Sequence, residues 1–261
     1  MKNIIKKLLF FSLICFAAHS HAMQEWIRAG EEWVRTGLES RGFIEPRPAT
    51  PTEELKRIID REDTFKNVGL TKIQQLIGMQ ADANVVGNSG KTALLIAIGD
   101  YEPSDKPTDA FLLVRLLAEF SKTDINKRYG QGLTPLAIAA GDGKAALIPV
   151  LIRFGADIHT KDDQNNTPLI LIARFADQEK AVEVAKRLQD AGIDVNAQNK
   201  DGETALYRAV LRKNYQLIQF LIEHGADATI PNNQGQTPLA LAQVNNDQKA
   251  IDLLSPKPER I

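Results

Sequence analysis

The sequence is nearly free of cysteine and poor in histidine. Its 261 residues include 1 Cys and 4 His. The cysteine, Cys15, lies in the apolar stretch of the first 22 residues, so removal of that stretch would leave no thiol and only His159 and His224. A disulfide framework, a thiolate zinc site and a cysteine nucleophile are therefore excluded, and stability must come from packing.

An excess of charge of either sign is also lacking, since the formal net charge is -1. Without a basic surface, nucleic acid is not an expected partner. The sequence has no G-x-S-x-G elbow, H-E-x-x-H helix or EF-hand series, and Gly87–Thr92 lacks the first glycine of a phosphate loop. We therefore expect no enzyme, no cofactor and no metal ion.

A hydrophobic run long enough to cross a bilayer is absent as well. Leu8–Ala18 is apolar over roughly 11 residues, whereas a spanning helix needs about 20. Lysines precede the run, and the small residues Ser20 and Ala22 follow it. This pattern predicts a Sec-type signal peptide over residues 1–22 and a periplasmic or secreted protein. An uncleaved leader that acts as a membrane anchor is the weaker alternative.

A motif repeats five times along the rest of the chain. A threonine followed by Pro or Ala and then Leu recurs at steps of 42, 33, 37 and 33 residues, and an aspartate precedes each threonine by ten residues. The threonines are Thr92, Thr134, Thr167, Thr204 and Thr237, and the aspartates are Asp82, Asp124, Asp157, Asp194 and Asp227. A regular step of this length indicates a repeat architecture.

Each unit carries the start and stop signals of two helices. Threonine is a good N-cap, and the proline that often follows it suits a first helical position. Apolar spacing such as Leu217, Ile218 and Leu221 predicts a second, amphipathic helix, which a glycine such as Gly225 ends. Another glycine marks a tight turn two residues before the threonine. Asn165, which takes this place in the third unit, is the non-glycine residue that best tolerates positive φ.

These motifs resemble the ankyrin repeat family, which shares the T-P-L-H tetrapeptide, the G-A-D turn and the step of about 33 residues. The resemblance covers roughly residues 65–254. It implies an all-α solenoid of about five to six helix–turn–helix repeats, with short β-hairpin-like turns and a concave face formed by hairpin tips and first helices. The histidine of the family tetrapeptide is absent from every unit, so its hydrogen bonds between repeats are expected to be missing.

The chain divides into five parts on these signals. Residues 1–22 form the signal peptide, 23–51 an N-terminal segment with a Pro-rich linker, 52–86 a degenerate capping repeat, 87–255 the ankyrin repeat domain and 256–261 a C-terminal tail. The units lie near 88–124, 130–157, 163–194, 200–227 and 233–255. Thr50 and Glu53 predict a capping box at the start of the degenerate repeat.

Two aromatic residues, Trp26 and Trp33, stand seven positions apart in the N-terminal segment. This segment either caps the exposed end of the first repeat or docks on a partner or a membrane. Membrane contact is expected only through this segment or the leader.

Two units contain extra residues. From threonine to the glycine that ends the second helix, the distance is 21 residues in two units and 25 in the third, and the first unit has nine more around Tyr101–Pro107. We expect the additions to lie between paired helices, where the first is a partner contact or a neutral insertion. Pro149 costs nothing in the first turn of its helix and up to about 3 kcal/mol further in.

The resemblance implies non-enzymatic binding of a protein partner. The turn positions that correspond to the contact positions of the family are Gln131, Leu133, Gln164, Asn166, Lys200, Asp201, Glu203, Gln234 and Gln236. Arg212, and Tyr207 if it points outward, extend this face, while Leu133 is either a hydrophobic contact or a packing residue. We expect a monomer. Replacing Lys200 and Glu203 together is expected to weaken binding without changing the melting temperature.

Overall fold

The computed structural model describes residues 29–30, 33, 49–102, 108–120, 122–173 and 177–255, without the side chains of residues 62–69. The chain divides into two compact units, Met1–Ala49 and Thr50–Ile261. The expected signal peptide, most of the N-terminal segment and the tail 256–261 lie outside the described residues.

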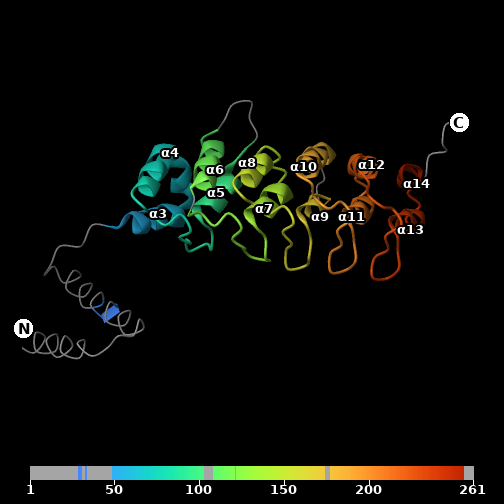
Figure 1. Ribbon diagram of the computed structural model, residues 1–261, viewed down its shortest axis with the longest axis horizontal. Coiled ribbons are helices and arrows are strands. Elements are labelled where there is room, and N and C mark those ends of the chain that lie inside the picture. Colours follow the sequence, from blue (N-terminus) through green and yellow to red (C-terminus); the bar gives the residue numbers. More distant parts are fainter. Residues whose placement is uncertain are drawn as a thin grey trace, which may run out of the picture. The chain divides into compact units, whose positions relative to one another are not determined.

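The described part of the second unit contains twelve α-helices and no strand (Figure 1). They are α3 (Pro51–Asp60), α4 (Glu62–Gly78), α5 (Ala93–Asp100), α6 (Asp109–Glu119), α7 (Pro135–Gly141), α8 (Leu147–Arg153), α9 (Pro168–Ile172), α10 (Gln178–Asp190), α11 (Ala205–Leu211), α12 (Tyr215–Glu223), α13 (Pro238–Val244) and α14 (Gln248–Leu254). Consecutive helices pack in pairs, α3 with α4 through α13 with α14. This confirms the expected all-α solenoid.

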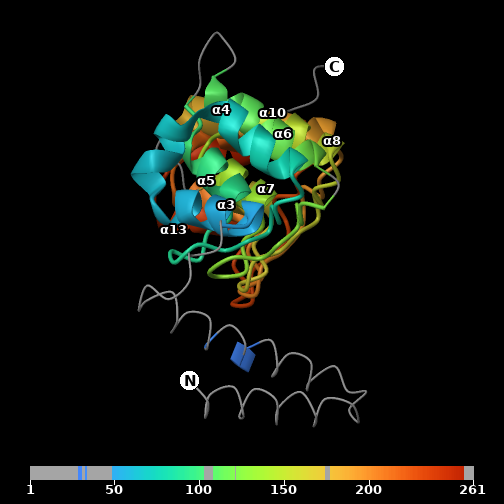
Figure 2. The same cartoon turned by 90° about the vertical axis from the view of Figure 1, so that its left-hand side faces the viewer.

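The helix pairs stack in chain order as two rows. First helices contact first helices, as α7 contacts α9, and second helices contact second helices, as α10 contacts α12. Figure 2, viewed along the stack, shows the first helices between the second helices and the turns, which project together on one side. The first helices and the turns therefore share one face of the repeat domain.

Threonine capping starts each of the five first helices, as expected. In the fourth unit the Thr204 hydroxyl accepts a hydrogen bond from the Tyr207 amide at 3.2 Å. The same bond occurs in the other four units at 3.2 to 3.5 Å. The small residue five positions after the threonine, such as Ala139 or Ala209, is completely buried, which allows neighbouring helices to approach closely.

The turn before each threonine contains a left-handed residue at the predicted place. Asn165 has φ 59°, close to the 76° of Gly202 in the next unit. The substitution of asparagine for glycine therefore preserves the turn. The predicted capping box at the start of α3 also forms, because the Thr50 amide donates to Glu53 Oε2 at 2.7 Å and the Glu53 amide donates to Thr50 Oγ1 at 3.2 Å.

The extra residues occupy two different places. In the first unit most of them lie between α5 and α6, as expected, and residues 103–107 of this insertion are outside the described part. For the third unit the expectation was wrong, because α10 has 13 residues against 9 in α12. The four added residues lengthen the second helix by about one turn, since an α-helix has 3.6 residues per turn.

Asparagines link the turns of successive units in a way that the sequence analysis missed. Two residues after a turn aspartate, Asn126 Nδ2 donates to the Gly155 carbonyl at 3.0 Å, and Asn126 Oδ1 accepts from the Asp157 amide at 2.8 Å. Asn84 and Asn196 make the same pair of bonds to the units that follow them. We call this pair of bonds the asparagine latch. Its sequence signal is an asparagine eight residues before the threonine.

Candidate partner-binding surface

Each of the last three turns is built around a buried polar side chain. Asn199 Oδ1 accepts hydrogen bonds from the amides of Asp201 at 3.0 Å and Glu203 at 2.9 Å. Asp162 and Asn232 accept from the amides two and four residues ahead in the same way. These side chains stand five residues before the threonine, and the sequence analysis did not single them out. They fix the turn backbone and so set the directions of the side chains at its tip.

Backbone hydrogen bonds join the tips of these turns to one another. The Asp163 amide donates to the Gln131 carbonyl, and the Lys200 amide donates to the Gln164 carbonyl, both at 2.9 Å. The Asn233 amide donates to the Asp201 carbonyl at the same distance. The tips of four successive units thus form one connected row with a regular spacing.

The predicted contact residues differ in exposure. Gln131, Gln164, Lys200, Asp201, Arg212 and Gln234 are exposed, whereas Leu133, Asn166, Glu203 and Gln236 are half-buried and Tyr207 is buried. The exposed members stand at the tips and just after a first helix. The exposed tip residues are therefore mostly uncharged amides, with Lys200 and Asp201 in the fourth unit and Asp163, paired with Arg128, in the third.

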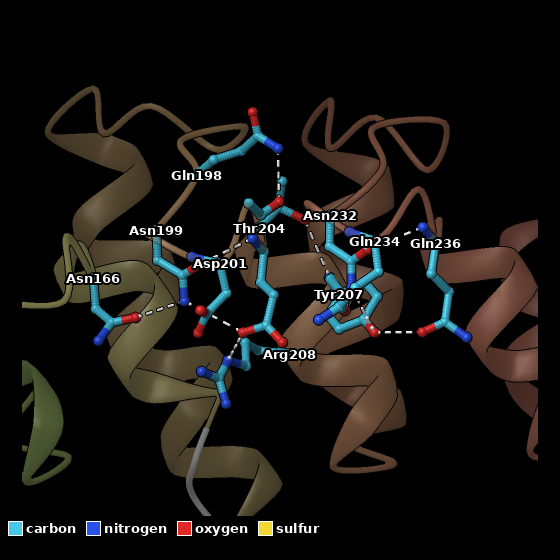
Figure 3. A network of polar contacts seen from close by, with 12 residues as sticks. Asn166, Gln198, Asn199, Asp201, Thr204, Tyr207, Arg208, Asn232, Gln234 and Gln236 are labelled. Atoms are coloured by element: carbon cyan, nitrogen blue, oxygen red, sulfur yellow. Dashed lines mark hydrogen bonds and ion pairs between the residues drawn. The ribbon is translucent and has the colours of Figure 1, made fainter.

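Glu203 contacts a polar network to which Asn166, Asn199 and Arg208, labelled in Figure 3, also belong. Its carboxylate pairs with Arg208 of α11 and accepts from Asn199 Nδ2 at 3.3 Å, and the same Nδ2 donates to Asn166 Oδ1 at 3.0 Å. The Glu203 side chain is only 14% exposed. Its replacement would therefore disturb the junction of a turn and a helix, so the expectation that a Lys200 and Glu203 double variant leaves the melting temperature unchanged does not fit this geometry.

Tyr207 does not point outward, because only 5% of the residue is exposed. Its hydroxyl donates to Gln236 Oε1 at 2.7 Å and accepts from Asn232 Nδ2 at 3.1 Å, and both partners belong to the following unit (Figure 3). Burial raises the pKa of Tyr207, and the nearby Glu203 carboxylate raises it further. Tyr207 stands at the fourth tetrapeptide position, so a tyrosine here supplies a hydrogen-bonded link between units where the family histidine is absent.

Leu133 lies at the only β-bridge between described residues. It exchanges two backbone hydrogen bonds with Tyr129, each of 2.9 Å. The Tyr129 hydroxyl lies 2.7 Å from the Thr92 hydroxyl of the preceding unit. Beside this turn, Arg128 pairs with Asp163 of the next turn at 2.9 Å. Leu133 therefore closes a small hairpin that is braced on both sides.

The described residues hold neither a cluster of possible metal ligands nor a helix that could span a bilayer. In this part of the chain no three His, Cys, Asp or Glu side chains gather in a way that could hold a metal ion. The helices described here are all too short or too polar to cross a bilayer. In the N-terminal compact unit, Met1–Ala49, the described Trp33 is 80% exposed, while Trp26 lies outside the described residues.

Comparison with known proteins agrees with the repeat geometry. A family model described as ankyrin repeats in three copies matches residues 108–199 and 175–260. The B-cell lymphoma 3 protein homolog of Mus musculus is 29% identical over 72% of this chain and 40% of its own length. The neurogenic locus notch homolog protein 1 of Xenopus tropicalis is 32% identical over 70% of this chain and 7% of its own length. Alpha-latrotoxin-Lg1a of Latrodectus geometricus is 31% identical over 51% of this chain and 10% of its own length.

Stacked helix pairs with linked turns define a helical repeat protein of the protein-interaction class. The chain belongs to the ankyrin repeat family, since the family model matches more than half of it. It spans less than half the length of each of these relatives. Ankyrin repeats are protein-interaction modules.

Proposed function

We propose that this protein is an exported, non-enzymatic ankyrin repeat scaffold that binds a protein partner through its turn tips and first helices. The observation that carries the proposal is the connected tip row. Backbone hydrogen bonds join Gln131 to Asp163, Gln164 to Lys200, and Asp201 to Asn233 beside Gln234. A surface that is ordered before binding loses little conformational entropy when a partner docks. Amide side chains can both donate and accept hydrogen bonds, which suits recognition of polar groups on another protein.

Affinity capture with a matched pair of triple variants tests this proposal. The tip variant carries Gln164→Ala, Lys200→Ala and Gln234→Ala, one change in each of three successive units. The control carries Lys186→Ala, Gln219→Ala and Gln248→Ala on the exposed sides of α10, α12 and α14. Both variants remove two amides and one lysine from exposed positions. A partner retained by wild type and control but lost by the tip variant supports the proposal, and equal retention by both variants contradicts it.

Export is the second part of the proposal, and it rests on the leader pattern of residues 1–22. A mature protein that begins at Met23 and is released from cells with the extracytoplasmic fraction would agree with a cleaved Sec signal. An intact N-terminus in the cytoplasmic fraction would contradict export.

A membrane-peripheral structural protein is the alternative function. The exposed indole of Trp33 favours it, because tryptophan partitions into the membrane interface. Binding to phosphatidylglycerol-containing vesicles that is lost after Trp26→Ala and Trp33→Ala would support the alternative. Mature protein that does not sediment with such vesicles would exclude it.

A further inference from the structure

Two aliphatic side chains stand exposed at one repeat position on neighbouring first helices. Leu211 is 41% exposed at the end of α11, and Val244 is 69% exposed at the end of α13. Both residues follow the capping threonine by seven positions, and α11 contacts α13 directly. The same position holds Gly99 in the first unit and Gly141 in the second. Among the described residues, a pair of exposed aliphatic side chains at this position therefore occurs only at the C-terminal end of the repeat stack.

The pairing of Arg208 with Glu203 shows which side of α11 carries Leu211. Arg208 reaches back to the turn that precedes its helix. Residues three and four positions apart lie on the same side of an α-helix. Leu211 and Arg212 follow Arg208 by three and four positions, so they continue the face that begins at the turn. By repeat equivalence, Val244 takes the corresponding place on α13.

Charge distinguishes this end of the face from the other. The Arg208 guanidinium is compensated by Glu203, whereas Arg212 and Lys213 are exposed and neither forms an ion pair with any described residue. The position of Arg212 is an aspartate in the first and second units, Asp100 and Asp142. Among the five units, this position therefore holds a cation only in the fourth. We call Leu211, Arg212 and Val244 the α11–α13 patch.

We propose that the α11–α13 patch binds a segment of the protein partner in which an aliphatic side chain adjoins a carboxylate. This inference rests on the proposed function and specifies the chemistry of the partner. The aliphatic side chain would remove Leu211 and Val244 from water, which is favourable in proportion to the apolar area buried. The carboxylate would pair with the guanidinium of Arg212, which can donate two parallel hydrogen bonds to it. The basic charge also disfavours a lysine or arginine at the same point.

Selection from a random dodecapeptide library displayed on phage tests the charge preference directly. The full chain is compared with Arg212→Glu and with the control Arg187→Glu, which makes the same change at an exposed site on α10. Wild type and control are expected to enrich peptides that place Leu, Ile or Val beside Asp or Glu. The Arg212→Glu variant is expected to enrich Lys or Arg beside the aliphatic residue. Selections without a charge preference, without enrichment, or with no change in Arg212→Glu overturn the inference.

A second arm separates this inference from the proposed function. The double variant Leu211→Ser and Val244→Ser is expected to reduce the affinity of a selected peptide at least tenfold while the chain keeps its helical circular dichroism spectrum, because neither side chain belongs to the buried core. If a partner captured through the tips binds this variant and Arg212→Glu unchanged, the scaffold function stands and the patch inference fails. A molecular mass by light scattering that falls in the double variant would make the patch a contact between copies of the chain and also overturn the inference.

Discussion

At the scale of single residues, Gly202 is constrained by both its backbone and its neighbours. Its φ of 76° lies in the left-handed region, and a Cβ would lie 2.7 Å from the Asn233 backbone nitrogen and 3.0 Å from the Asn232 carbonyl carbon. Gly235 has an almost identical φ of 77°, but nothing lies within 4 Å of its Cβ position. The two glycines therefore separate the cost of the conformation from the cost of a close approach.

We expect Gly235→Ala to lower the free energy of unfolding by about 1 to 2 kcal/mol, the usual cost of a left-handed alanine. Gly202→Ala should cost roughly 1 to 3 kcal/mol more, because the backbone of the next turn must shift. Urea denaturation of both variants measures the difference. Equal losses would show that the neighbouring turn accommodates the methyl group.

His159 occupies the place of the latch asparagine in the third unit. Its neighbours in the stack, Asn126 and Asn196, each make two hydrogen bonds to the following turn. His159 is exposed, so replacing it removes no buried contact. The Gly192 carbonyl and the Asp194 amide are the groups that a new asparagine would meet.

His159→Asn is expected to raise the free energy of unfolding by about 1 kcal/mol, since a net hydrogen bond contributes roughly 0.5 to 1.5 kcal/mol. Asn126→Ala, which removes an existing latch, is expected to lower it by a similar or larger amount. Chemical denaturation monitored by circular dichroism gives both values. A loss of stability in His159→Asn would mean that the third junction cannot hold the latch geometry.

At the scale of elements, α8 settles the position of Pro149. Pro149 is the third residue of this helix, which begins at Leu147 after the N-cap Ala146. The first amide groups of an α-helix have no partner within the helix, so the missing N–H of proline leaves no hydrogen bond unmade. Proline also restricts the unfolded chain and thereby favours folding.

Pro149→Ala is therefore expected to lower the free energy of unfolding by about 0.4 to 1 kcal/mol through the unfolded state. A proline in the helix interior would give the opposite sign, with the alanine variant more stable by up to about 3 kcal/mol. The urea midpoint of the variant decides between a first-turn and an interior proline, provided that the denaturant dependence of the free energy of unfolding is unchanged. A more stable Pro149→Ala variant would contradict the first-turn placement.

At the scale of the whole molecule, the features that follow from one unit were predictable and those that depend on two units were not. The threonine caps and the left-handed Asn165 follow from local backbone preferences, which the sequence shows directly. The burial of Tyr207 depends on Asn232 and Gln236 of the next unit. Likewise, the role of Glu203 depends on where α11 places Arg208. The predicted contact residues therefore include exposed tip residues such as Lys200 together with side chains that the fold buries, and binding at the tips stays a prediction.

All four tyrosines of the chain share one electrostatic property. Burial is the main cause that raises the pKa of Tyr101, Tyr129, Tyr207 and Tyr215 above the ordinary value of 10.0. For Tyr129 the hydrogen bond with Thr92 lowers the pKa in part, but the net direction remains upward. The folded state thus favours neutral tyrosines. Their contribution to stability is complete below about pH 10 and is lost as the pH rises through the raised values.

The free energy of unfolding is therefore expected to fall above about pH 10, because the unfolded chain releases tyrosine protons that the folded chain retains. Tyr129→Phe should lower the free energy of unfolding near pH 8 by roughly 0.5 to 1.5 kcal/mol, because the bond between the Tyr129 and Thr92 hydroxyls is lost. Between about pH 8 and 11, the free energy of unfolding of this variant should fall less than that of the wild type. Urea denaturation at several pH values between about 8 and 11 measures both slopes, and lysine titration is common to the two proteins. If the free energy of unfolding falls with pH at the same slope in wild type and Tyr129→Phe, Tyr129 ionises alike in the folded and unfolded chains. Its link between the first two repeats is then not sensitive to alkali.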